Sequence, residues 1–319
     1  MRSPSVIACG GEALIDFTQG EDGRYTPHPG GSPYNVAVAL ARQEVPTVFL
    51  GQISRDLFGE QLLSHLLSSG VATRHVARSE RPSTLAFVDT RSSAEPQYAF
   101  YATGAADVEL SLEALPAAPG ASLTHLGSIS LMQEPCGRTW EQYAGAMKGR
   151  LSLDPNIRPG LIADREAYLG RFGRLLARTT LLRLSRADLE WLRPGRDEAG
   201  AACDLLTQGP ALVVVTAGKE GATLYAPEFT LFQPAFPVTV ADTVGAGDTF
   251  TAGFLAELHR RDFPLQDAAQ LQLCLRWGAA CASLCCQQVG AHPPTFAETL
   301  AFDALHGSRS EQEVHHAQP

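Results

Sequence analysis

The stretch 241-ADTVGAGDTF-250 places Gly245 and Gly247 directly before Asp248, and the sequence DTFTAGFLAELHR (248–260) then predicts a helix. Glycine adopts positive φ angles and leaves no Cβ between the backbone and a ligand. The free N–H groups and the dipole at a helix start attract anions, typically phosphate. Asp248 would repel a bound anion, but it could take a proton from a hydroxyl while the amides stabilise a transferring phosphoryl group. The alternative interpretation is a helix N-cap after a glycine turn.

Composition narrows the class of protein. The chain has 319 residues, enough for one large α/β domain or two ordinary ones, and 45% of them are hydrophobic. Its 25 basic and 34 acidic residues give a net charge of −9, which argues against nucleic acid or an anionic membrane surface as the main partner. No apolar run is long enough to span a bilayer.

The seven cysteines lack the spacing of a disulfide framework. Cys281, Cys285 and Cys286 could suggest a metal site, but neither paired CxxC motifs nor a matching pair of histidines accompanies them. We interpret them as buried thiols in a helix, because free cysteine behaves as a small hydrophobic residue. This cysteine usage is typical of a reducing, cytoplasmic compartment.

Strand-like apolar segments alternate with segments of helical periodicity, and this alternation predicts an α/β fold with a mostly parallel sheet covered on both faces. The strand-like segments are 5–11, 47–53, 123–129, 150–156, 179–185 and 211–218, and the helical ones are 33–43, 57–70, 139–149 and 168–178. After residue 250 the pattern is almost wholly helical.

Two segments break the rhythm. Residues 11–30 and 83–103 alternate apolar and polar side chains around central turn residues, as hairpins do. We expect them to form a small β-sheet lid that keeps water from a reacting group. The polar segment 307–319 is expected to be a flexible tail.

A second glycine-rich segment favours the catalytic interpretation of residues 241–250. In PGGSPYNVAVALARQEVPTVFLGQISRDLFGEQL (29–62), a Gly-Gly pair precedes a helix that carries Asn35. Together with DTVGAGDTFTAGFL (242–255), this segment resembles the two signatures of the ribokinase-type sugar kinases, the PfkB carbohydrate kinase family. The resemblance implies an ATP-dependent sugar kinase. It also implies a three-layer α/β/α sandwich with a β-sheet lid, with residues 1–306 as the kinase domain.

The resemblance also assigns residues around the acceptor sugar. Asp248 would be the catalytic base, beside an anion hole from the amides of Gly245, Ala246 and Gly247. Three further segments resemble the family's sugar contacts, namely GEALIDF (11–17), DPNIRP (154–159) and EPQYAFYATGAADVEL (95–110). With the Gly-Gly element, they assign to the sugar site Asp16, Gly30, Gly31, Asn35, Tyr101, Asp107, Asp154, Asn156 and Arg158. Without the resemblance, Asp16 could end a strand in a turn and Asn156 could form an Asx turn.

The nucleotide side matches less closely. VVVTAGKEGATLY (213–225) resembles the strand and glycine turn under the adenine nucleotide, and implicates Thr216, Gly218 and Gly221. In LLRLSRADLEWL (181–192), Arg183 and Asp188 replace a family lysine and glutamate, and Ser185 lies between them. We expect Arg183 and Ser185 at the nucleotide and Asp188 at Mg²⁺, reached through a water molecule. Asp242 and the loop 287–295 resemble a monovalent-cation site, which leaves K⁺ activation open.

Within the family, segments 95–110 and 154–159 look most like bacterial fructokinases, so we expect phosphorylation of D-fructose at a terminal hydroxymethyl group. A kinase for 2-keto-3-deoxygluconate is the alternative, with Arg91 considered for the substrate carboxylate. A catalytically silent sugar- or nucleotide-binding regulator is the alternative from another class. The expected partners are the small-molecule sugar and ATP. A homodimer formed through the lid is left open.

Overall fold

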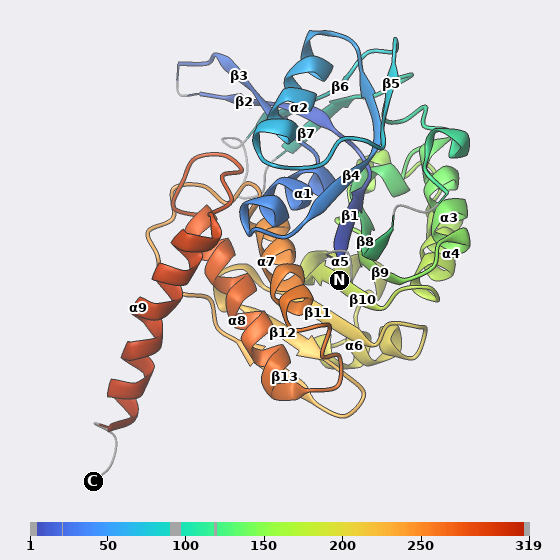
Figure 1. The fold of residues 1–319 in the computed structure, drawn as a ribbon. Helices are drawn as coiled ribbons and strands as arrows, with labels where there is room; N and C mark the ends of the chain where they lie inside the picture. The colour runs from blue at the N-terminus through green and yellow to red at the C-terminus, as the bar shows by residue number, and fades with distance from the viewer. Residues whose placement is uncertain (1–4, 21, 90–96, 118–119, 316–319) are drawn as a thin grey trace.

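The computed structural model describes residues 5–20, 22–89, 97–117 and 120–315. Its centre is a nine-stranded sheet in the order β13-β12-β11-β10-β9-β8-β1-β4-β5 (Figure 1). All neighbouring pairs are parallel except β11–β12 and β12–β13. The strands are β1 (Val6–Gly10), β4 (Thr47–Ser54), β5 (Val76–Ser79), β8 (Ala121–Gly127), β9 (Arg150–Asp154), β10 (Leu181–Ser185), β11 (Leu212–Thr216), β12 (Ala222–Tyr225) and β13 (Thr230–Gln233).

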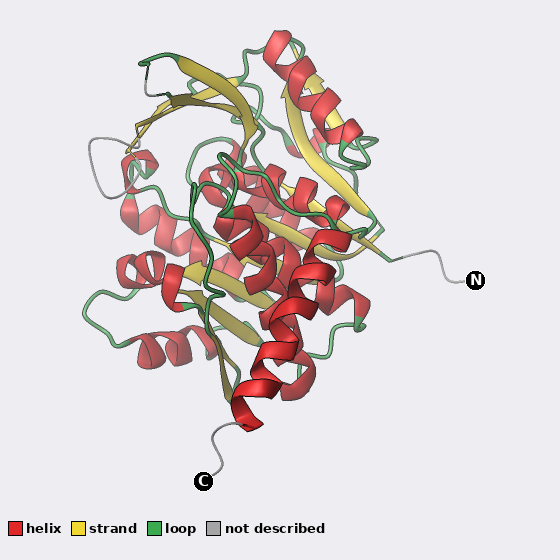
Figure 2. Cartoon of the chain, turned by 90° about the vertical axis from the view of Figure 1, so that its left-hand side faces the viewer, coloured by secondary structure: helices red, strands yellow, loops and turns green. Residues whose placement is uncertain are grey.

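Helices cover both faces of this sheet (Figures 1 and 2). The helices are α1 (Ser32–Arg42), α2 (Leu57–Ser68), α3 (Cys136–Ala146), α4 (Arg165–Leu176), α5 (Arg186–Leu192), α6 (Glu198–Leu206), α7 (Ala246–Arg260), α8 (Ala268–Cys285) and α9 (Phe296–His315). Buried side chains of α1, α2, α7 and α8 form one core with Ile7 and Cys9 of β1, and those of α3 to α6 form another with Ala8. Successive strand residues therefore fill opposite cores, as in a three-layer sandwich. The predicted fold class is confirmed.

The two hairpin-like segments meet in a separate four-stranded sheet, β3-β2-β6-β7, above one end of the central sheet (Figure 1). Its strands are β2 (Leu14–Gln19), β3 (Tyr25–Gly30), β6 (Thr84–Asp89) and β7 (Gln97–Tyr101). The β2–β3 and β6–β7 pairs are antiparallel hairpins, and β2 joins β6 in parallel. We call this sheet the lid.

Helices α8 and α9 contain Cys281, Cys285 and part of the polar C-terminal segment 307–319. Cys281 and Cys285 are buried free thiols, and the described residues contain no group of three or more His, Cys, Asp or Glu side chains that could hold a metal ion. In the same described part of the chain, no helix is long and apolar enough to cross a membrane. Helix α9 continues to His315, into the segment expected to be a flexible tail, and its Glu and Gln residues are good helix formers.

Candidate active site

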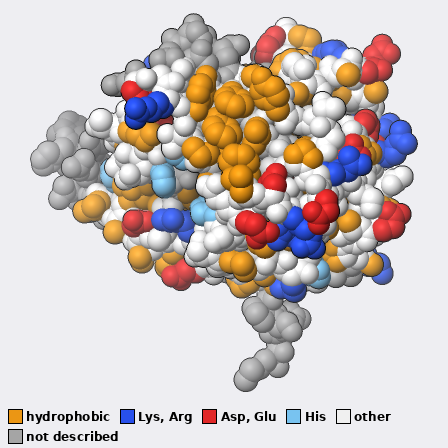
Figure 3. Space-filling view, turned by 90° about the horizontal axis from the view of Figure 1, so that it is seen from above, with side chains coloured by type: hydrophobic (Ala, Val, Ile, Leu, Met, Phe, Trp, Pro, Cys, Tyr) orange, Lys and Arg blue, Asp and Glu red, His pale blue; other side chains and the backbone are white. Residues whose placement is uncertain are grey.

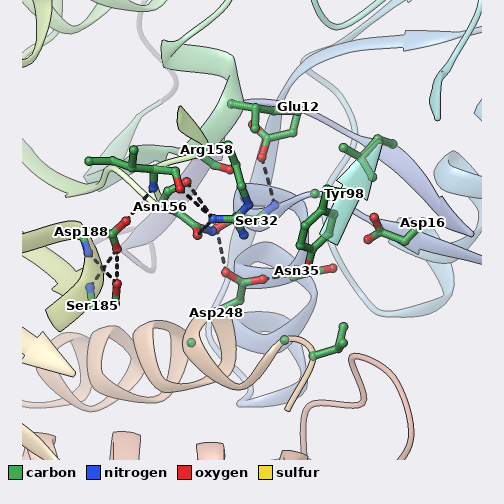
Figure 4. Close-up of a pocket in the computed structure, with 18 of the residues that line it drawn as sticks. Glu12, Asp16, Ser32, Asn35, Tyr98, Asn156, Arg158, Ser185, Asp188 and Asp248 are labelled. Atoms are coloured by element: carbon green, nitrogen blue, oxygen red, sulfur yellow. Dashed lines mark hydrogen bonds between the residues drawn. The ribbon is translucent and has the colours of Figure 1, made fainter. Parts of the chain in front are cut away.

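A cavity of about 500 Å³ lies where the carboxyl ends of the parallel strands, the start of α7 and the lid meet. Open α/β folds bind ligands at this end of the sheet. Figure 4 shows the polar side chains that face the cavity. Eleven of the sequence-predicted residues line it, namely Asp16, Gly31, Asn35, Asn156, Arg158, Arg183, Ser185, Asp188, Gly245, Gly247 and Asp248.

Asp248 lies in the first turn of α7, with 8% of its surface exposed. Two side chains of α1 hold its carboxylate: Ser32 donates its hydroxyl to Oδ1 at 2.7 Å, and Asn35 donates Nδ2 to Oδ2 at 2.9 Å (Figure 4). Burial raises the pKa of Asp248 to about 6, although both hydrogen bonds act in the opposite direction. Such a carboxyl group is ionised at neutral pH and is a stronger base than an ordinary aspartate.

The turn into α7 needs its glycines. Gly245 adopts a left-handed conformation with φ of 75°, and a Cβ there would lie 2.6 Å from the Cβ of Ala291. A Cβ on Gly247 would lie 2.9 Å from the guanidinium of Arg183. Because the first N–H groups of a helix lack intrahelical acceptors, this turn presents backbone donors beside a cation. Ala246 belongs to the same turn but does not line the cavity.

Arg183 of β10 is buried and supplies that cation. Its guanidinium donates to Oδ2 of Asp154 at 2.8 Å and to the hydroxyl of Thr216 at 2.7 Å. Asp154 is fully buried at the end of β9 and does not line the cavity, and neither does Thr216. Both were expected to contact substrates. They instead contact Arg183, because a buried guanidinium requires hydrogen-bonded partners.

A carboxyl group, an amide and a guanidinium also line the cavity, from Asp16, Asn156 and Arg158. Burial and the nearby Asp248 charge raise the pKa of Asp16 on β2 to about 7, while Arg158 acts to lower it. Arg158 donates to Oδ1 of Asn156 at 2.7 Å and lies over the ring of Tyr98, 5.1 Å from its centroid. These three groups are therefore available to hydroxyl groups of a ligand.

Gly30 shapes the site because it has no side chain. It does not line the cavity, but a Cβ there would lie 2.1 Å from Oδ2 of Asp16. Only glycine leaves room for the Asp16 carboxylate on the neighbouring strand.

Two lid-side expectations differ from the structure. Tyr101 is 66% exposed and packs edge to face on Phe87, whereas Tyr98 and Phe100 line the cavity. Side chains alternate along β7, so residues 98 and 100 share the face opposite to residue 101. Asp107 is buried and accepts a hydrogen bond from the hydroxyl of Thr84 at 2.5 Å, outside the cavity lining.

On the nucleotide side, Ser185 and Asp188 form the capping box of α5 and line the cavity. Asp188 accepts the N–H of Ile157 at 2.7 Å, and the N–H and hydroxyl of Ser185 at 2.9 and 2.6 Å. Gly218 and Gly221 lie in the β11–β12 turn outside the lining, with φ of 55° and 121°. A Cβ on Gly221 would lie 2.1 Å from the carbonyl oxygen of Gln233, so this glycine is required by the close approach of two chain segments.

Asp242 is half-buried outside the cavity lining and joins two loops. Its Oδ1 accepts the N–H of Val244 at 3.1 Å, and its Oδ2 accepts the N–H of Gly290 at 2.8 Å. Ala291, in the same loop as Gly290, packs closely against Gly245. The loop 287–295 therefore supports the turn at the start of α7.

Several lining residues were not predicted from the sequence, among them the polar residues Glu12, Ser32 and Tyr98. Glu12 is buried, and its two carboxylate oxygens accept the N–H groups of Ser32 at 3.0 Å and Ser130 at 3.2 Å. Glu12 and Ser32 lie inside the quoted segments 11–17 and 29–62. For Glu12, the available signal was an acidic residue directly after an apolar strand that ends in Gly10-Gly11.

The family follows from comparison with known proteins. Residues 6–297 match the family described as pfkB family carbohydrate kinase. The chain belongs to this family. It is 41% identical over 261 residues to a fructokinase of Rhizobium leguminosarum bv. trifolii, with 79% of each chain covered. The expected family and enzyme class, a carbohydrate kinase, are confirmed.

Solved structures agree with the fold of this carbohydrate kinase. A fructokinase from Xylella fastidiosa with bound ATP superposes with a TM-score of 0.87 at 28% identity, covering 96% of this chain and 100% of that chain. A fructokinase double mutant from Vibrio cholerae, in its fructose, ADP and potassium ion bound form, gives a TM-score of 0.86 at 26% identity, covering 94% and 98%. The expected ribokinase-like fold is confirmed.

Proposed function

We propose that this kinase transfers the γ-phosphoryl group of ATP to a terminal hydroxymethyl group of D-fructose. The observation that carries the proposal is the buried Asp248 carboxylate, held in the cavity at the start of α7 and facing the sugar-side groups Asp16 and Arg158. The fructokinase relatives, and the ATP, fructose and ADP bound in two fructokinase structures, support the choice of fructose and ATP.

In this mechanism, Asp248 accepts the proton of the acceptor hydroxyl as its oxygen attacks the γ-phosphorus. The bond from that phosphorus to the bridging oxygen breaks, and ADP leaves. The N–H groups of Gly245 and Gly247, together with the positive charge of Arg183, stabilise the negative charge on the transferring group. The N–H of Ala246, also expected in this anion hole, donates instead to the carbonyl oxygen of Thr243 at 3.2 Å. Phosphoryl transfer depends mainly on such positioning and charge stabilisation.

Mg²⁺ enters as part of the nucleotide substrate. Asp188 faces the cavity, and its two oxygens accept three hydrogen bonds, which leaves capacity for one more donor such as a metal-bound water. Mg²⁺ in phosphoryl-transfer sites keeps several waters, so this indirect contact fits. Asp242 and the loop 287–295 are the residues we propose for K⁺.

We also propose a homodimer formed through the outer face of the lid. Phe17, Tyr25, Phe87 and Tyr101 pack against one another there, and Tyr25 and Tyr101 are exposed. Figure 3 shows apolar side chains gathered on the upper face of the molecule. A second copy would cover this apolar surface. Light scattering that gives a monomer mass at micromolar concentration would reject this assembly.

The test of the function is ADP release with separate acceptors: D-fructose, mannose, ribose, adenosine and 2-keto-3-deoxygluconate, each with and without K⁺. We expect the highest kcat/KM with fructose. Preference for the sugar acid would favour the alternative kinase, for which Arg91 lies outside the described residues. Sugar binding without turnover of any acceptor would favour the silent regulator.

Asp16 should make sugar affinity depend on pH. Because its pKa lies near 7, the carboxylate that accepts hydrogen bonds from sugar hydroxyls is lost as pH falls through that value. We expect the KM for fructose to rise about tenfold per pH unit below this range, as for loss of one required ionised group. Asp16→Ala should have a high KM that does not vary with pH. A pH-independent KM in the unaltered protein would contradict this role.

A further inference from the structure

Ser32 donates hydrogen bonds from both its backbone and its side chain to acidic residues of the cavity. It is the first residue of α1, after Gly31 with φ of 107°, and only 7% of its surface is exposed. Its N–H donates to Oε1 of Glu12, whose other oxygen accepts from Ser130. A Cβ on Gly31 would lie 2.7 Å from the carbonyl oxygen of Glu12, so the chain is packed tightly here. These contacts hold the backbone of Ser32 against Glu12, which lines the cavity.

The two donors to Asp248 differ in capacity. An asparagine amide has two N–H donors, so Asn35 can contact Asp248 and still donate to a sugar hydroxyl. A serine hydroxyl has one O–H donor, and that of Ser32 points to Oδ1 of Asp248 (Figure 4). The donor of Ser32 is thus committed to the carboxylate.

We propose that Ser32 is a positioning residue for the phosphoryl transfer: its hydroxyl fixes the Asp248 carboxylate toward the acceptor hydroxyl and favours its ionised form. This inference rests on the proposed function of Asp248 as the base. One hydrogen bond to each carboxylate oxygen leaves lone pairs on both, so the base keeps room for an incoming hydroxyl.

The charges around Asp248 explain why a donor matters. Burial and the charge of Asp154 on β9 disfavour its ionised form, while Arg183 on β10 favours it, and Asp16 on β2 faces the same cavity. Glu12, Asp188 and Arg158 face the same cavity. With these groups unchanged, loss of the Ser32 hydrogen bond removes a contact made to the ionised form, and the pKa of Asp248 must rise.

The test is the pH dependence of kcat with saturating fructose and ATP, measured for the unaltered protein, Ser32→Ala and Ser32→Thr. We expect the acidic limb of Ser32→Ala to move up by about one pH unit, and threonine, which keeps the donor, to restore it. Ser83→Ala is the matched control, because the Ser83 hydroxyl donates to Asp56 at 2.8 Å away from the cavity. This control should leave the limb in place.

The proposal would be overturned if the acidic limb of the kcat–pH profile did not move in Ser32→Ala, or if it moved equally far in Ser83→Ala. If Ser32→Ala does not fold, Ser32→Cys gives the same comparison, because a thiol is a weak donor of similar size. Titration of Asp248 by carboxyl ¹³C NMR reads the same shift without turnover. An inactive unaltered protein would reject the proposed function, whereas an active protein with no shift at Asp248 would reject only the role of Ser32.

Discussion

Asp248→Asn is expected to lower kcat for fructose by about 10²–10⁴, because asparagine cannot accept the proton of the acceptor hydroxyl. Asparagine keeps nearly the same shape and can still bond to Ser32 and Asn35, so sugar binding should change only a few-fold. Steady-state ADP release gives kcat, and calorimetric titration with fructose gives the binding constant.

Asp267→Asn is the matched control for this substitution. Asp267 caps α8, where its side chain accepts the N–H of Gln270, and it is not among the residues that line the cavity. Asparagine caps helices as well as aspartate does, so both activity and stability should be retained. Near-normal turnover by Asp248→Asn would remove Asp248 from its proposed role as base.

Arg183→Met is expected to have the second large effect, on both stability and turnover. It would leave Asp154 buried without its partner, and breaking a buried ion pair in this way costs about 3–5 kcal/mol. Removing the cation beside Gly247 should also lower kcat by about 10²–10³, as for loss of one group that stabilises transition-state charge. Denaturant unfolding and ADP release measure the two effects separately.

A double variant separates the two roles of Arg183. Adding Asp154→Leu removes the buried charge left behind, so the free energy of unfolding should recover in part while kcat stays low. Arg276→Met is the control at a more exposed ion pair. The side chains of Arg276 and its partner Asp303 are 24% and 30% exposed, against 9% and 1% for Arg183 and Asp154, so loss of the Arg276 pair should cost less stability and leave turnover unchanged. Recovery of kcat in the double variant would show that Arg183 acts only on folding.

Six of the nine central strands, β1, β4, β8, β9, β10 and β11, were predictable from apolar runs that alternate with helical periodicity. The short strands β5, β12 and β13 were not predicted. The continuous apolar run 211–215 matches a strand buried on both faces, since a parallel sheet covered by helices needs no polar face. The lid was predictable because β2 and β3, and likewise β6 and β7, are neighbours in sequence.

Two kinds of detail were not predictable: which face of a strand a residue occupies, and which residues far apart in the sequence are in contact. On β7, a difference of one residue decides whether Tyr98 or Tyr101 faces the cavity, and three aromatic residues in four positions give no alternation to read. The acid Asp154 meets Arg183 only through the register of β9 and β10. Sequence alone therefore could not separate groups that touch a substrate from groups that hold them.

The proposed reaction requires the acceptor hydroxyl, the side chain of residue 248 and the N–H groups at the start of α7 to meet at one point in the cavity. A crystal structure of Asp248→Asn with fructose and a non-hydrolysable ATP analogue tests it most directly. We expect a terminal hydroxyl within about 2.6–3.2 Å of the residue 248 side chain, with the γ-phosphate against Gly245 to Gly247. A sugar whose hydroxyl groups all lie beyond hydrogen-bond reach of residue 248 would contradict it.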